Sequence, residues 1–268
     1  MDKIEVTVLM SMYNTPIDQL KQAIESIINQ TYKNFEFLII DDYADPICTE
    51  TVEKYKDTRI RLIHNENNIG LEKSLNKGLK LAAGKYIIRM DTDDISYPDR
   101  IQKQIEFAKK HPEYSIIGGR ANYFNEDGIY GTSTKKGEIT KKDLLFGTPF
   151  IHPSMLIRKK DILSIGGYPL YKRCEDYAMV MEMYAKGFKG YIMDTLVIKY
   201  RMDDKAYLKK KFRYRIIETE MKIKYFRKLN VEWYKYIFAI KPIIVGLIPA
   251  KIIKKYHKYI LGGATKIT

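Results

Sequence analysis

The sequence predicts an α/β protein with a doubly wound, mainly parallel sheet, because strand and helix patterns alternate through its first half. Short apolar runs at 4–10, 37–40 and 86–90 have the composition of strands that are covered on both faces. Helical patterns lie between them, at 15–28 and 71–83. Strands connected in this way form a parallel sheet through right-handed crossovers.

The helix after the first strand has a clear start signal. Thr15 is a capping residue, Pro16 is expected at the first helical position, and Asp18 lies three residues after the cap. The next predicted elements are a strand at 59–64 and a helix that ends at Gly84.

The second half of this body is less regular. We expect strands at 114–124 and 154–158 and a helix at 174–187. A hairpin-type turn is expected at Asn125-Glu126-Asp127-Gly128.

Charge divides the chain of 268 residues into two parts. Residues 1–204 hold 30 basic and 30 acidic side chains, whereas residues 205–268 hold 17 Lys and Arg against 3 Asp and Glu. We therefore expect a body over 1–204 and a basic extension over 205–268, whose charge favours an anionic partner. The two cysteines, Cys48 and Cys174, do not form a disulfide framework, and the chain starts without a signal-peptide pattern, so a cytoplasmic location is expected.

An acidic cluster, Asp91-Thr92-Asp93-Asp94, directly follows the strand-like run at 86–90. Carboxylates this close together repel one another, so a bound cation is one reason for a fold to hold them. An Asp-x-Asp pair offers hard oxygen ligands to Mg²⁺ or Mn²⁺, and ligands of open α/β sheets bind at the carboxyl ends of strands. The alternative is an acidic surface turn.

A second acidic pair, Asp41-Asp42, follows the strand at 37–40. A nucleotide lying across the strand ends would meet both acidic groups, and Tyr13 and Asn14 would line the same crevice. In the alternative interpretation, the pair only caps the turn that follows.

Five motifs together resemble family 2 glycosyltransferases of the GT-A fold, over roughly residues 4–204. They are Val8-Leu9-Met10-Ser11-Met12-Tyr13-Asn14, Ile39-Ile40-Asp41-Asp42, Asn67-Asn68-Ile69-Gly70 with Asn76-Lys77-Gly78, Met90-Asp91-Thr92-Asp93-Asp94, and Cys174-Glu175-Asp176. The step His152-Pro153-Ser154 and the segments Lys241-Pro242 to Pro249 and Lys255-Tyr256-His257 are most similar to the branch found in bacterial exopolysaccharide operons.

The resemblance implies a UDP-sugar donor that is bound by a nucleotide-sugar half, about 1–112. Asp42 and Tyr13 would recognise the uracil, with Ser11 close by. Asp91 and Asp93 would be the Asp-x-Asp pair, with Asp93 as the more direct ligand of Mn²⁺ or Mg²⁺.

An acceptor half, about 113–204, would carry the catalytic carboxylate. By the resemblance, Asp94 supports the acidic cluster and Asp176 is the general base. A base that faces the donor from the side opposite to its leaving group gives one displacement and inversion. The alternative for Asp176, and more so for Glu175, is a carboxylate stabilised by a helix N-terminus.

The sequence departs from the family in one motif. Many members have Tyr-Arg-x-His late in the catalytic domain, and here the run is Tyr200-Arg201-Met202-Asp203. Asp203 is also a hard-metal ligand, but it adds negative charge near the phosphates, whereas Arg201 is suited to clamp them. His152 either lines the acceptor side of the crevice or is a hydrogen-bonded packing residue.

The extension starts with an amphipathic basic pattern over 205–228, typical of helices that lie on membrane surfaces. Its apolar residues are Leu208, Phe212, Ile216, Ile223 and Phe226, and lysines that would meet anionic lipid follow at Lys251, Lys254, Lys255 and Lys258. The apolar segment 237–253 is too interrupted to span a bilayer. Alternatively, the apolar residues pack on the body. No nucleic-acid partner is expected, because no binding motif accompanies the charge.

The sequence thus predicts a metal-dependent inverting glycosyltransferase that moves a sugar to a glycan or lipid-linked acceptor at the inner face of a bacterial membrane. One alternative is a sugar nucleotidyltransferase, which needs a glycine-rich, basic loop after the first strand; Ser11–Pro16 contains neither residue type. The other is a non-catalytic binding protein that kept the fold.

Overall fold

The computed structural model describes residues 4–202, 212–248 and 252. The strands are β1 (Val6–Met12), β2 (Phe35–Asp41), β3 (Ile60–His64), β4 (Tyr86–Met90), β5 (Ile95–Ser96), β6 (Tyr114–Asn125), β7 (Gly128–Thr132), β8 (Gly137–Ile139), β9 (Leu156–Arg158) and β10 (Lys189–Arg201). The helices are α1 (Ile17–Ile28), α2 (Pro46–Glu53), α3 (Leu71–Leu81), α4 (Arg100–Lys110), α5 (Lys159–Ser164), α6 (Glu175–Ala185), α8 (Phe212–Lys228) and α9 (Ile237–Gly246). Short 3-10 helices are η1 (Asp143–Leu145), η2 (His152–Ser154) and η3 (Trp233–Tyr236).

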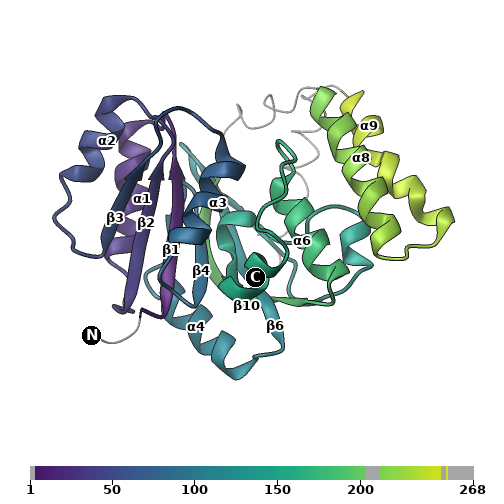
Figure 1. The fold of residues 1–268 in the computed structure, drawn as a ribbon, viewed down its shortest axis with the longest axis horizontal. Helices are drawn as coiled ribbons and strands as arrows, with labels where there is room; N and C mark the ends of the chain where they lie inside the picture. Colours follow the sequence, from purple (N-terminus) through teal and green to yellow (C-terminus); the bar gives the residue numbers. More distant parts are fainter. Residues whose placement is uncertain (1–3, 203–211, 249–251, 253–268) are drawn as a thin grey trace.

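One sheet runs through the body in the order β3-β2-β1-β4-β9-β6-β10-β5, with β7 paired to β6 and β8 paired to β10. The strands β1 to β4 are parallel, as predicted, and so are β6 and β10. Antiparallel pairs all involve strands of the second half: β9 joins β4 to β6, the turn at 125–128 makes a hairpin, and β10 pairs with β5 and β8. The predicted α/β fold is confirmed (Figure 1).

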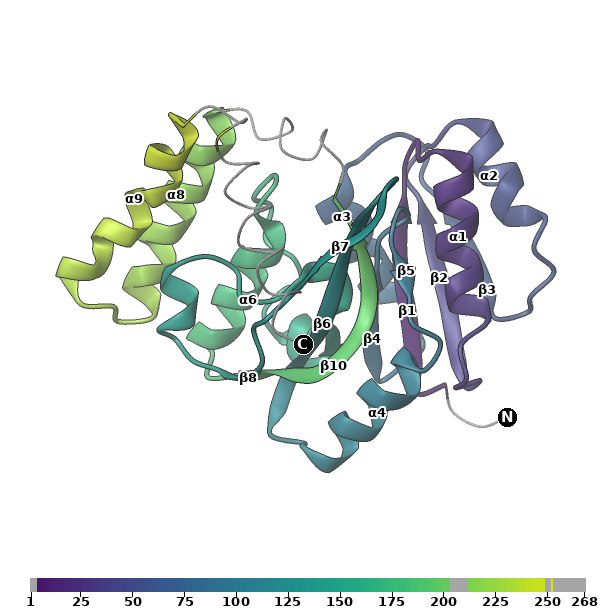
Figure 2. The same cartoon turned by 180° about the vertical axis from the view of Figure 1, so that it is seen from behind.

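Helices cover both faces of the sheet (Figures 1 and 2). Alternate residues of β1 separate into two cores: Val8 and Met10 pack with α1 and α4, whereas Leu9 packs with α3 and α6. Because side chains of a strand alternate between faces, Ser11 lies on the α3 and α6 face with Leu9. Arg89 lies on that same face, two residues after Ile87.

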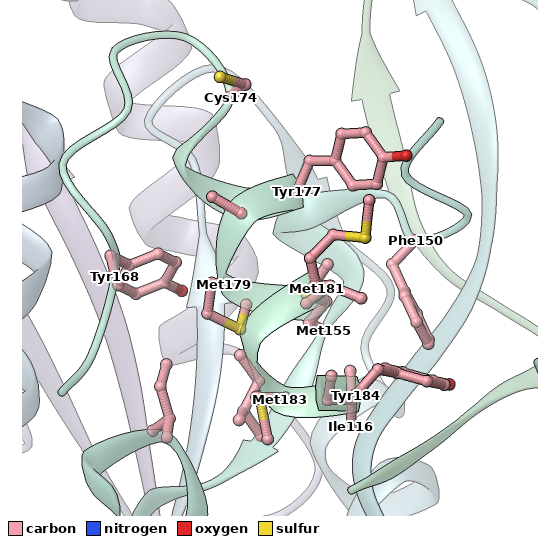
Figure 3. Close-up of a cluster of buried hydrophobic side chains, with 14 of the residues drawn as sticks. Ile116, Phe150, Met155, Tyr168, Cys174, Tyr177, Met179, Met181, Met183 and Tyr184 are labelled. Carbon is pink, nitrogen blue, oxygen red and sulfur yellow. The ribbon is translucent and has the colours of Figure 1, made fainter. Parts of the chain in front are cut away.

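Helix α6 is buried around most of its circumference, which holds its first turn in a fixed place. Its side chains Met179, Met181 and Met183 are fully buried, and the close-up shows them within a cluster that includes Phe150 and Met155 (Figure 3). A helix that is apolar all round needs cover on every side. The sheet covers one side of α6 and α8 covers another (Figure 1).

Two predicted helix boundaries were wrong. The cap of α1 is Pro16 and not Thr15, whose hydroxyl hydrogen-bonds the hydroxyl of Thr92 at 2.6 Å instead. Helix α3 ends at Leu81 and not at Gly84. The glycine is needed because a Cβ there would lie 2.4 Å from the backbone nitrogen of Thr7.

The extension packs on the body through one face of α8. Met221, Tyr225 and Phe226 are buried in the core that contains α6, and Ile223 packs against it, whereas Phe212 and Ile216 are exposed. Packing on the body thus accounts for part of the predicted apolar face. Leu208, Lys251, Lys254, Lys255 and Lys258 lie outside the described residues.

A buried lysine fastens the extension to the body. The Nζ of Lys222 donates hydrogen bonds to the carbonyl oxygens of Leu145, at 2.9 Å, and Phe238, at 2.6 Å. Burial lowers the pKa of this amine to about 8. Among the helices of the described residues, none is long and apolar enough to cross a membrane.

A buried arginine holds the end of β4, and we expect its loss to destabilise the fold. Arg100 donates to the carbonyl oxygens of Arg89, at 2.9 Å, and Pro153, at 2.6 Å, and to the hydroxyl of Ser96. In Arg100→Met both carbonyls lose their donor, which costs about 1–3 kcal/mol each. The free energy of unfolding measured in urea should therefore fall by about 2–5 kcal/mol.

The matched control is Lys103→Met on the exposed side of the same helix. Its ion pair with Asp99 lies at the surface, so the free energy of unfolding should change by less than about 1 kcal/mol. Equal losses in the two variants would contradict the role of Arg100.

Candidate active site

Loops that leave β1, β2 and β4 meet at one edge of the sheet and are tied together. The backbone N–H of Asp42 donates to the carbonyl oxygen of Met12 at 2.9 Å, and that of Asp45 donates to Asn14 Oδ1 at 2.7 Å. The hydrogen bond between the hydroxyls of Thr15 and Thr92 joins the first loop to the acidic cluster. The loops that carry the predicted nucleotide-binding and metal-binding residues are therefore joined to one another by hydrogen bonds.

Asp42 is buried and organises the loop before α3. Its carboxylate accepts hydrogen bonds from the backbone N–H groups of Ile69 and Gly70 and from Asn65 Nδ2, each at 2.9 Å. The motif Asn67-Asn68-Ile69-Gly70 is thus a turn built on this carboxylate. A direct contact between Asp42 and uracil stays a prediction.

Asp41 is also buried, and its carboxylate stabilises the loop after β2. One oxygen accepts from the backbone N–H of Ala44 at 2.8 Å, and the other accepts from Thr49 Oγ1 at 2.8 Å and lies 2.9 Å from His64 Nδ1. These contacts are those of a turn-capping residue, which was the alternative for the pair.

Two tyrosine rings are exposed beside these carboxylates. Tyr13 follows β1, as predicted, and Tyr43 follows Asp42 at the end of β2, with a positive φ of 63°. Tyr43 was not among the predicted residues, although its place directly after an acidic strand end was a usable signal. A non-glycine residue held in the left-handed region is uncommon, and here it turns an aromatic ring out at the edge where a base would bind.

The predicted acidic cluster is present. Carboxylate oxygens of Asp91, Asp93 and Asp94 lie within 4.8 Å of one another. Asp91 Oδ1 accepts a 2.6 Å hydrogen bond from the buried guanidinium of Arg89. Arg89 was not among the predicted residues, because nothing in a strand-like run shows which side chain will pair with the cluster.

Asp94 is the most buried member of the cluster. One oxygen accepts a 2.8 Å hydrogen bond from the backbone N–H of Arg201, and the other, also buried, has no hydrogen-bond partner among the described residues. Burial and the charges of Asp91 and Asp93 raise the pKa of Asp94 well above its usual value. Several oxygen ligands with incompletely compensated negative charge fit a hard divalent cation.

Arg201 reaches the cluster from the end of β10. Its Nε donates to the carbonyl oxygen of Asp93 at 2.8 Å, and its guanidinium lies 4.4 Å from the centre of the Phe124 ring. The predicted phosphate clamp is therefore beside the predicted metal ligands. Asp203 lies outside the described residues.

Glu175 and Asp176 form the first turn of α6, where the helix dipole favours negative charge. Glu175 is buried, and desolvation together with the charge of Asp176 raises its pKa to about 8. Asp176 is partly exposed. Burial raises the pKa of Tyr200, and the charges of Asp94, Asp91, Asp93 and Asp176 raise it further.

His152 packs against Tyr168. Its Nε2 lies 3.0 Å from the tyrosine hydroxyl, and the two rings meet edge to face. Burial and the charge of Arg89 lower the pKa of His152 well below its usual value, so the ring is neutral at pH 7. The contact is that of a hydrogen-bonded packing residue, and a contact with the acceptor stays a prediction.

The motif Asn76-Lys77-Gly78 positions the loop that carries Tyr168. Asn76 Nδ2 donates to the carbonyl oxygen of Tyr168 at 2.9 Å, and its Oδ1 accepts the backbone N–H of Tyr168 at 2.7 Å. A Cβ on Gly167 would lie 2.2 Å from that Oδ1, and a Cβ on Gly78 would lie 2.3 Å from Leu9 Cδ1. Both glycines are therefore required for close packing.

Residues 7–166, more than half of the chain, match the family described as Glycosyl transferase family 2. The chain belongs to glycosyl transferase family 2. It is therefore a glycosyltransferase, as the motifs predicted, and the matched residues include the strand ends at Asp42 and Asp91–Asp94.

Two relatives extend the similarity beyond the matched domain. EpsE of Bacillus subtilis (strain 168), which is named as a glycosyltransferase, is 33% identical over 95% of this chain and 93% of its own length. The amylovoran biosynthesis glycosyltransferase AmsE of Erwinia amylovora is 29% identical over 73% of this chain and 75% of its own length.

Solved structures confirm the GT-A fold. TarS residues 1–349 of S. aureus in complex with UDP-GlcNAc matches with a TM-score of 0.65 at 16% identity, over 91% of this chain and 82% of that one. The mannosyltransferase PcManGT of Pyrobaculum calidifontis, in complex with GDP-Man and Mn²⁺, matches with a TM-score of 0.61 at 15% identity, over 96% and 80% of the two chains. At such identities the match establishes the fold alone.

Proposed function

We propose that this glycosyltransferase is metal-dependent and inverting, and that it transfers a sugar from a UDP-sugar to a glycan or a lipid-linked acceptor. The observation that carries the proposal is the cluster of Asp91, Asp93 and Asp94, whose carboxylate oxygens lie within 4.8 Å of one another at the end of β4. Arg201 lies beside the cluster and donates a hydrogen bond to the carbonyl oxygen of Asp93. In this proposal the acidic cluster holds the donor through a cation, and the separate carboxylate of Asp176 serves the acceptor.

The donor would lie across the strand ends. The exposed rings of Tyr13 and Tyr43 offer aromatic surfaces to its base, and Asp42 holds the loop before α3 through three hydrogen bonds. Asp91 and Asp93 would hold Mn²⁺ or Mg²⁺, which supplies positive charge to the diphosphate as it leaves. The complexes of TarS with UDP-GlcNAc and of PcManGT with GDP-Man and Mn²⁺ support a nucleotide-sugar donor and a divalent cation.

Asp176 is the candidate general base. An acceptor hydroxyl is a weak nucleophile, so a carboxylate within hydrogen-bond reach must take its proton as the bond to the anomeric carbon forms. The neighbouring Glu175 is less suited, because a pKa of about 8 keeps it protonated at neutral pH. A base on the acceptor side gives a single displacement, and an α-linked donor then yields a β-linked product.

The pathway we propose is bacterial exopolysaccharide biosynthesis at the cytoplasmic face of the membrane. It is supported by the similarity to AmsE, which is named for amylovoran biosynthesis, and by the basic extension over 205–268.

A titration of the purified protein by calorimetry tests this function. UDP and a panel of UDP-sugars should bind in the presence of Mn²⁺, one UDP-sugar should bind best, and EDTA should abolish the heat of binding. A sugar nucleotidyltransferase would instead accept a nucleoside triphosphate and a sugar phosphate and release pyrophosphate. Absence of any nucleotide binding would favour the non-catalytic binding protein.

A further inference from the structure

Helix α9 is apolar on two opposite sides, and one of these sides is uncovered. Ala239 and Pro242 are buried against the rest of the extension. On the outer side, Ile237, Ile240, Ile244 and Leu247 follow one another at spacings of three and four residues and are 44–73% exposed. A helix that is apolar all round is normally buried, so the outer side of α9 requires a further partner.

The uncovered surface continues onto neighbouring segments. Trp233 is 85% exposed and Tyr234 is also exposed in η3, and Phe146 of the body packs its exposed ring on Phe238 at 4.8 Å between centroids. We call this set the α9 outer surface: Phe146, Trp233, Tyr234, Ile237, Ile240, Ile244 and Leu247. Monomeric soluble proteins rarely expose so many large apolar side chains together.

Lysine side chains lie on the two segments, η3 and α9, that carry most of the α9 outer surface. Lys241 is exposed between Ile240 and Ile244 in the sequence, and Lys235 lies in η3. Lys235 forms a 2.8 Å ion pair with the exposed Glu232, and the Nζ of Lys241 lies 3.5 Å from the carbonyl oxygen of Phe146. Lys241, together with the excess of basic residues in the extension, gives the apolar stripe a positively charged rim.

We propose that the α9 outer surface binds the headgroup region of an anionic lipid bilayer. The ten residues of α9 are about 15 Å long, half of the ~30 Å hydrocarbon core, so the helix lies along the interface. Trp and Tyr favour this zone, where one end of the ring is apolar and the other is wet. A second copy of the chain is a poorer partner, because a two-fold interface would bring the same lysines together.

The location of the surface also indicates the acceptor class, an inference that rests on the proposed transferase function. Figures 1 and 2 show α9 as the outermost element at one end of the molecule, with α8 between it and α6. Lys222 joins α8, the first turn of α9 and the body, and α6 carries Asp176 in its first turn. A protein held to the bilayer by α9 would have its catalytic body next to the membrane, which suits an acceptor saccharide carried on a lipid.

Trp233 is the single tryptophan of the chain, so tryptophan fluorescence reports on the α9 outer surface alone. Full-length protein is mixed with vesicles of phosphatidylglycerol and phosphatidylcholine, or of phosphatidylcholine only. With anionic vesicles, the emission maximum should shift to the blue, brominated lipid should quench it, and the protein should float with the vesicles. High salt should weaken the binding, because the rim charges are screened.

A pair of variants distinguishes specific binding of vesicles by the α9 outer surface from non-specific binding through any exposed apolar side chain. The double variant Ile240→Glu with Ile244→Glu places two charges in the apolar stripe, and we expect it to lose vesicle binding by at least tenfold. The control, Ile47→Glu, changes a side chain of α2 that is 58% exposed, compared with 54% for Ile244, and it should bind vesicles as the unchanged protein does. Calorimetry with UDP-sugar and Mn²⁺ should be unchanged in every variant.

Three outcomes would overturn the proposal. One is an emission maximum that does not move with anionic vesicles, and another is vesicle binding that survives in the double variant. The third is a mass measurement showing a dimer that the double variant dissociates, which would assign the surface to a second copy of the chain. Vesicle binding by a protein that binds no UDP-sugar would support the surface and count only against the transferase chemistry.

Discussion

Asp176→Asn should stop sugar transfer while leaving donor binding intact. The amide keeps the size of the side chain but cannot accept the acceptor's proton, and general base catalysis contributes about 10²–10⁴-fold to such reactions. We therefore expect kcat to fall by about 10³-fold. The measurements are product formation by mass spectrometry and the affinity for UDP-sugar by calorimetry.

The control for this substitution is Asp99→Asn, which removes a carboxylate exposed at the surface and paired with Lys103. Its kcat should be unchanged. If Asp176→Asn lost donor binding together with activity, the carboxylate would be a structural group at the start of α6 and another base would be required.

Asp93→Ala should remove the metal dependence of donor binding. The unchanged protein is expected to bind UDP-sugar more tightly with Mn²⁺ than with EDTA. Loss of even an outer-shell partner costs about 10–100-fold in metal affinity, so loss of a ligand should cost at least that. The ratio of the two donor affinities is the measurement, and it should approach one in the variant.

Asp127→Ala in the β6–β7 turn is the matched control, because that carboxylate lies in an exposed turn and accepts a hydrogen bond from Asn125 of the same turn. A metal response in Asp93→Ala equal to that of the unchanged protein would exclude Asp93 as a ligand. Asp91 and Asp94 would then have to hold the cation.

The sequence predicted the parallel half of the fold well, since its elements are encoded locally. The apolar run that became β2 and the periodic pattern that became α3 each carry their own signal. Thr15 shows where local reasoning fails. Its residue type and position are those of a helix cap, but its hydroxyl hydrogen-bonds Thr92, which lies 77 residues further along the chain.

The acidic cluster of the candidate site was predictable from the sequence, but the contacts of the candidate residues were not. Strand ends and family motifs located Asp42, Asp91, Asp93 and Asp176. They did not show that the carboxylate of Asp42 accepts hydrogen bonds from the backbone N–H groups of Ile69 and Gly70. Arg89 was missed for the same reason, because pairing in three dimensions leaves no pattern in one segment of sequence.

The order of synthesis along the chain has a consequence for when the site can form. Arg201, at the end of β10, supplies the backbone N–H that binds Asp94, 107 residues earlier in the chain. At translation rates of about 5–20 residues per second, the acidic loop leaves the ribosome about 5–20 s before this partner does. During this time Asp94 lacks its hydrogen bond from Arg201, because β10 has not yet been made. A nascent chain therefore cannot assemble the whole site until β10, the last strand of the body, has been synthesised.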